Sequence, residues 1–284
     1  MNKKTWILYG FYAAVVAVFF FYYLFPSQSL KAYIISQAGK VNPDFSLSAS
    51  KAELVFPYRI RLHQVDLNYL ADRLIEAEEL TLAPRLQSLI SRKSTFAFSM
   101  NAHRGLITGT ADISDGKRLV LNAVASGVQL ADIPFLKNMS SNRVEGVLQG
   151  AISYAAGNGR LETLNVDLDI TDMAIVLASP FFTLEKINFD IVEADAVLQN
   201  QQLKISRIIL TGDQIEGNLS GYASMPNDIR QTNVNLSGTV MPQQQFVESS
   251  GFQIPPPFLD SLKTGGGIPI RISGPLDDLR LSAK

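Results

Sequence analysis

The sequence predicts a mainly β fold, in which a single N-terminal transmembrane helix is followed by a long, curved, mostly antiparallel β-sheet with a few short helices. Two observations predict this fold. Residues 6–25 form an uncharged run, and most segments after it alternate apolar and polar residues, with turn residues between them. We therefore divide the chain into a cytoplasmic stub with a membrane anchor, residues 1–26, and a β domain, residues 27–284.

The uncharged run is long enough to cross a bilayer once, because a helix needs about 20 apolar residues to do so. Lys3 and Lys4 precede it, and the positive-inside rule then places the N-terminus in the cytoplasm and the β domain across the membrane. A cleaved signal peptide is the alternative, but its apolar core would span only about 7–15 residues before a small-residue cleavage site. We favour a retained anchor. Its predicted membrane residues are Trp6, Tyr9, Tyr22, Tyr23 and Phe25, of which the first four fit an aromatic belt.

Strands are predicted where apolar residues recur at every second position. Such a period places all the apolar side chains of a strand on one face of the sheet. Asp115-Gly116 and the segment 157–159 are typical of tight hairpin turns, and a slip of the apolar phase between Leu62 and Val65 indicates a bulge or bend. The apolar positions that we expect to line one common face are Phe45, Leu47, Phe96, Phe98, Leu164, Val166, Leu168, Ile268, Ile270 and Ile272.

Helical patterns are few and short, at residues 27–39, 84–92, 130–139 and 243–250. They are too few to cover the apolar face of a long sheet, and proteins rarely leave so large an apolar patch in water. Three arrangements solve this problem. The sheet folds onto itself as a sandwich, closes as a barrel, or curls into a trough or incomplete barrel that holds an apolar ligand.

A short glycine-containing phrase recurs three times, at residues 105–113, 146–154 and 217–225. Each copy carries two glycines four residues apart, which places both on the same face of a strand. One interpretation is a series of strands that bend alike and form one curved wall. The other is that these are ordinary strand-end glycines in a β-rich chain.

Composition and motifs argue against catalysis and against nucleic-acid binding. The formal net charge is -1, so the chain has no basic field to attract nucleic acid. Cysteine is absent, and the two histidines, His63 and His103, have no metal-binding spacing. The chain also lacks a G-x-S-x-G elbow and a phosphate-binding glycine loop before a helix. We therefore expect a non-enzymatic protein with no catalytic residue, metal site or cofactor.

The order of these features resembles a known family. After the anchor and a short helix come the alternating segment 44–54, the Phe56-Pro57 turn and the strand 60–67, and the chain closes with a strand-Gly-Pro-Leu-Asp-Asp-strand phrase at residues 270–281. Together they resemble the type II secretion system protein N family and, more loosely, the AsmA-like envelope proteins. The resemblance implies a single-pass inner-membrane protein of a Gram-negative bacterium with a periplasmic domain. The AsmA-like side implies a trough-shaped sheet that carries lipid.

Three functions remain as hypotheses. The first is a non-catalytic accessory component of a type II secretion machine that docks other secretion-system or envelope proteins. The second is a lipid carrier in which the lining residues named above contact phospholipid. The third, an envelope enzyme with a carboxylate-only site, has no motif to support it. The expected partners are the inner membrane, envelope proteins and phospholipid.

Overall fold

The computed structural model describes most of the chain from Ser27 onward. The residues outside the description are 1–5, 7–8, 14–15, 17–19, 21–26, 42–44, 71, 86–92, 115–117, 140–141, 158–159, 182–183, 200–201, 225–230, 251–266, 277 and 284. Most of the predicted anchor, with Tyr22, Tyr23 and Phe25, falls in these gaps, whereas Trp6 and Tyr9 are described as helical and exposed. Within the described residues, no helix has both the length and the hydropathy that crossing a bilayer requires.

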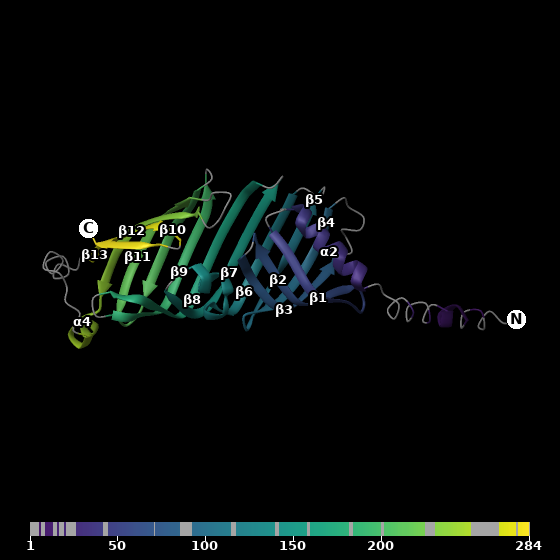
Figure 1. The fold of residues 1–284 in the computed structure, drawn as a ribbon, viewed down its shortest axis with the longest axis horizontal. Helices are drawn as coiled ribbons and strands as arrows, with labels where there is room; N and C mark the ends of the chain where they lie inside the picture. The colour runs from purple at the N-terminus through teal and green to yellow at the C-terminus, as the bar shows by residue number, and fades with distance from the viewer. Residues whose placement is uncertain are drawn as a thin grey trace.

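The body of the protein is one open antiparallel sheet of fourteen strands, which pair strictly in sequence order from β1 to β14 (Figure 1). This confirms the mainly β, mostly antiparallel fold. The strands are β1 (Phe45–Val55), β2 (Arg59–Tyr69), β3 (Asp72–Pro84), β4 (Lys93–Ala102), β5 (Gly105–Ser114), β6 (Arg118–Gln129), β7 (Arg143–Gly157), β8 (Arg160–Phe181), β9 (Leu184–Gln199), β10 (Gln202–Thr211), β11 (Ile215–Ser224), β12 (Asn233–Pro242), β13 (Ile268–Pro275) and β14 (Arg280–Ala283).

Short helices lie at the edge and rims of the sheet. They are α2 (Ser27–Val41), the 3-10 helix η2 (Leu130–Asp132), α3 (Pro134–Met139) and α4 (Gln244–Ser250). Three of the four predicted helical segments are thereby confirmed. For the fourth, at 84–92, the structure shows that β3 continues to Pro84, and residues 86–92 lie outside the described part.

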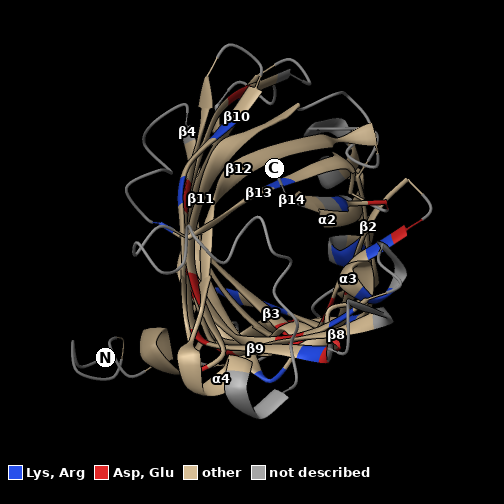
Figure 2. Cartoon of the chain, turned by 90° about the vertical axis from the view of Figure 1, so that its left-hand side faces the viewer, with Lys and Arg blue, Asp and Glu red and all other residues tan. Residues whose placement is uncertain are grey.

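The sheet is long and strongly curled. Its strands run across the long axis of the molecule in Figure 1, and Figure 2, which looks along that axis, shows the sheet curving round on itself. Helix α2 lies on the concave side near β2 (Figure 2), and its Ile34 packs against apolar residues of β1–β4. Register shifts interrupt seven of the thirteen strand pairings. Such bulges bend the strands that carry them and so contribute to the curl.

Near Val65 of β2, where the sequence predicts that the apolar positions shift by one residue, the strand bends. Gln64 has a positive φ of 48°, while β1 and β2 keep one register across it. The side chain of Ser50 caps the bend, because its Oγ donates a hydrogen bond to the carbonyl oxygen of His63 at 2.9 Å. Register shifts lie nearby, between Leu67 and Asn68 where β2 pairs with β3, and between Ala77 and Glu79 where β3 pairs with β4.

Buried apolar residues gather in separate groups instead of one continuous core. One group surrounds Leu62 on β1–β4 beneath α2, and a second surrounds Leu236 on β10–β13. Leu62 is the only large side chain of the described residues that is less than 2% exposed. The long middle of the sheet therefore has an apolar face that the described helices leave partly accessible.

Candidate functional site

The candidate site is the apolar face of the sheet, which the strand pairings define residue by residue. Starting at Leu54 on β1 and following direct cross-strand partners, one row crosses all fourteen strands without meeting a polar side chain. This first apolar row is Leu54, Ile60, Leu82, Phe98, Gly109, Ala123, Ile152, Val166, Ala196, Ile205, Gly221, Leu236, Ile272 and Leu281.

A second apolar row runs beside the first on the same face. It too crosses all fourteen strands without a polar side chain, so the two rows together form a charge-free strip. The second apolar row is Ala52, Leu62, Leu80, Met100, Ile107, Ala125, Gly150, Leu168, Ala194, Ile208, Leu219, Gly238, Ile270 and Ala283. Fourteen strands spaced about 4.8 Å apart make each row about 60 Å long.

The ten predicted lining residues all belong to this apolar face. Phe98, Val166 and Ile272 lie in the first row, and Leu168 and Ile270 lie in the second. The other five lie beside the rows on the same side of β1, β4, β8 and β13; they are Phe45, Leu47, Phe96, Leu164 and Ile268. Ile268 is buried and the other nine are partly buried, so none of the ten is exposed.

The positions between the two rows lie on the opposite face, and several of them carry charge. Arg61, Asp167 and Asp195 are examples, and in β8 the residues that alternate with Val166 are exposed. Ion pairs cross the strands on this face, including Arg61 Nε to Glu79 Oε1 at 3.1 Å and Arg207 Nε to Asp195 Oδ2 at 2.9 Å. The sheet therefore separates an apolar inner face from an outer face that carries charged and polar side chains.

Glycines on the apolar face allow neighbouring strands to approach closely. A Cβ atom added to Gly150 would lie 2.3 Å from the carbonyl oxygen of Asp167, and one added to Gly221 would lie 2.1 Å from that of Asn235. Both glycines also have positive φ angles, of 155° and 158°, which residues with side chains rarely adopt. In the first copy of the repeated phrase, neither Gly105 nor Gly109 has a positive φ, so the three copies do not share this backbone conformation.

Tyr154 on β7 belongs to the same face, in a row parallel to the two defined above, through its partners Leu121 and Leu164. Desolvation by burial raises the pKa of its hydroxyl above the ordinary value of 10.0. A raised tyrosine pKa is the expected effect of a surrounding of low polarity, because such a surrounding disfavours the charged phenolate.

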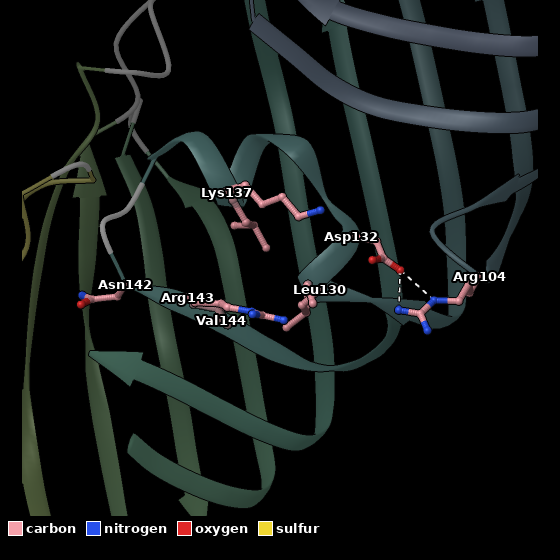
Figure 3. Close-up of a pocket in the computed structure, with 9 residues that line it drawn as sticks. Arg104, Leu130, Asp132, Lys137, Asn142, Arg143 and Val144 are labelled. Carbon is pink, nitrogen blue, oxygen red and sulfur yellow. Dashed lines mark hydrogen bonds and ion pairs between the residues drawn. The ribbon is translucent and has the colours of Figure 1, made fainter. Parts of the chain in front are cut away.

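A pocket of about 520 Å³ lies at one rim of the sheet, where α3 and η2 meet the ends of β4, β5 and β7 (Figure 3). Asp132 accepts hydrogen bonds from Arg104 Nη2 at 2.6 Å and from Arg104 Nε at 2.7 Å. In Figure 3, Lys137 and Arg143 extend toward the side on which Leu130 and Asp132 lie. The nine lining residues are Arg104, Leu130, Ala131, Asp132, Leu136, Lys137, Asn142, Arg143 and Val144.

His103 lies next to this pocket, in the two-residue turn that joins β4 and β5. His103 and Arg104 have positive φ angles of 51° and 63°, as a tight type I′ hairpin turn requires. Burial lowers the pKa of His103 below its ordinary value of 6.5, and the nearby Lys137 lowers it further, while Asp132 and Glu76 act in the opposite direction. The imidazole is therefore held in its neutral form near neutral pH.

The sequence predicts the apolar face but not the rim pocket. Its lining comes from segments that lie up to 40 positions apart, and none of them carries a recognisable motif. In the described part of the chain, no three His, Cys, Asp or Glu side chains come together in a way that could hold a metal ion. Comparisons with models of protein families, with curated proteins and with solved structures found no match to this chain.

Proposed function

We propose that this protein binds phospholipid and holds its acyl chains along the apolar face of the curled sheet. The observation that carries the proposal is the pair of apolar rows, which cross all fourteen strands without a polar side chain. A face of this length that is only partly covered is unfavourable in water, and acyl chains would bury it. Each buried methylene group contributes about 0.8 kcal/mol.

The dimensions of the apolar face suit this occupant. Each row is about 60 Å long, roughly twice the thickness of the hydrocarbon core of a bilayer. Lipid chains placed lengthwise along the trough would therefore contact several strands each. The partly buried state of Val166 and Leu168 in the middle of the sheet leaves such chains access to the wall.

The test is whether phospholipid stays with the full chain during purification. We expect lipid extraction and native mass spectrometry to recover phospholipid with the full-length protein from the detergent-solubilised membrane fraction. The proposal is refuted if the full chain is folded and carries no phospholipid, and if no detergent occupies the trough in its place.

A second candidate function is the accessory role in a type II secretion machine, with residues 1–26 as its inner-membrane anchor and the β domain in the periplasm. It rests on the family resemblance and on the open edge of the sheet. The last strand, β14, pairs with β13 only through Ile270–Ser273. Strand addition at such an edge is a common mode of partner docking.

This second candidate is tested by cross-linking in cells. A photoreactive amino acid at Ser282, an exposed residue of β14, should capture another envelope protein if β14 is a docking edge. The same residue placed at Lys204 on the outer face of β10 is the control. Equal capture at both positions, or capture at neither, would contradict docking at β14.

A further inference from the structure

The rim pocket is next to the apolar face and is itself partly apolar. Val144 at the start of β7 pairs with Ile175 of β8 on the side that carries the apolar rows, and Leu130 in η2 is buried. One side of the pocket is therefore continuous with the surface to which we assign acyl chains.

The other side of the pocket carries an excess of positive charge. Arg104 is paired with Asp132, and Arg143 Nε lies 3.0 Å from Glu145 Oε1. Lys137 forms no ion pair with any residue that the structure describes. Arg104, Lys137 and Arg143 are thus balanced by only two carboxylates. This leaves one net positive charge next to the charge-free strip formed by the two apolar rows.

We propose that this pocket binds the phosphate of a phospholipid headgroup, with Lys137 and Arg143 as its cationic contacts and the acyl chains entering the groove past Val144. This inference rests on the proposed function. An occupant that has an anionic head and apolar tails matches both sides of the pocket, whereas a neutral lipid matches only one. The charged rim pocket therefore selects for anionic lipid and sets where along the trough a lipid enters.

The experiment compares two photoactivatable lipids that differ only at the head. Full-length protein in detergent micelles is labelled with phosphatidylglycerol or with diacylglycerol, each carrying the same photoreactive acyl chain. We expect phosphatidylglycerol to label the protein about threefold to tenfold more strongly, since exposed charge contacts contribute little each. The double substitution Lys137→Gln with Arg143→Gln should reduce this labelling to the level of diacylglycerol. Lys204→Gln, which removes an exposed cation from the outer face of β10, should change nothing.

The outcomes separate the two proposals. If both lipids label equally, or if the double substitution has no effect on the preference, the headgroup pocket is wrong and the groove stands. If neither lipid labels the protein, the proposed function itself fails. If both lipids label equally and inorganic phosphate binds the wild-type protein but not the double variant, the pocket binds free phosphate and the lipid assignment is overturned. Diacylglycerol labelling that stays constant among the variants shows that each has kept its fold.

Discussion

Asp167 on β8 lies directly opposite Asp195 on β9, on the charged face of the sheet. One residue earlier, Val166 lies opposite Ala196 on the apolar face. Of these two adjacent residues of β8, Asp167 therefore lies next to a carboxylate on the outer face, and Val166 lies next to a methyl group on the apolar face. This alternation makes substitutions at neighbouring positions of β8 sharply different in their expected effects.

Val166→Asp should abolish the recovery of phospholipid with the full chain. The new carboxylate would stand in the middle of the first apolar row, and burying an unpaired charge against acyl chains costs several kcal/mol. The readout is the amount of phospholipid extracted per mole of purified protein.

Asp167→Ala is the matched control for this prediction, because it alters the next residue of the same strand. It should leave phospholipid recovery unchanged, since Asp167 is exposed on the other face. Equal losses in the two variants would show that lipid retention does not depend on the face to which a side chain points.

Arg207→Ala should lower stability, and low salt should make the loss larger. Arg207 lies 2.9 Å from Asp195 and 3.6 Å from Glu193, and those carboxylates lie opposite Asp167 and Asp169. Without the arginine, the repulsion among four carboxylates is no longer offset. Because these groups are partly exposed, we expect a loss of about 0.2–1 kcal/mol in urea unfolding at low ionic strength, shrinking toward zero in 1 M salt. A loss that does not respond to salt would point to packing instead of charge.

Gly221→Ala should destabilise the sheet by about 1–3 kcal/mol. A methyl group at this position would lie 2.1 Å from the carbonyl oxygen of Asn235, and the positive φ adds backbone strain.

The control is Gly39→Ala in α2, where an added Cβ meets no atom within 4 Å. Alanine is the better helix former, so this variant should be more stable by about 0.5–1 kcal/mol. Chemical denaturation of both variants tests the opposite signs. A neutral effect at Gly221 would contradict the close approach of β11 and β12.

Much of the fold was predictable from the sequence because period-two alternation directly reports which residues share a face. Spacing alone predicts that Phe96 and Phe98, like Leu164 and Val166, share one apolar face, and the strand pairings confirm it. The shortage of helices left a sandwich, a barrel and a trough as alternatives, and the structure is a single curled sheet. Pro84, which is typical of a helix start, instead ends strand β3, and residues 86–92 of that predicted helix lie outside the described part.

The rim pocket was not predictable because no local pattern encodes it. Arg104, Lys137 and Arg143 come from a hairpin turn, a six-residue helix and a strand start, and only the folded sheet brings them to one rim. Likewise, the sequence indicated a bend near Val65 but not that Gln64 would supply it through a positive φ. Tertiary packing decides such details.

Acidification should weaken the fold in a way that depends on His103. Its pKa in the folded state lies below the ordinary value of 6.5, so the unfolded chain takes up a proton first as the pH falls. The contribution of neutral His103 to the free energy of unfolding is therefore fully present above about pH 6.5 and is lost as the pH falls below it. His103→Asn should reduce this decline between pH 8 and pH 5.5 in urea unfolding, and asparagine tolerates the positive φ of 51° at this position. An identical decline in the wild-type protein and the variant would show that His103 does not contribute.

The central claim is that acyl chains lie on one face of the sheet, and a cross-linking scan along β8 tests it most directly. A photoreactive amino acid is placed in turn at each position from 164 to 169 in the full chain, and phospholipid adducts formed in cells are detected by mass spectrometry. We predict adducts at Leu164, Val166 and Leu168 and none at Asn165, Asp167 and Asp169, which are exposed on the outer face. Adducts at all six positions, or at none, would contradict the account.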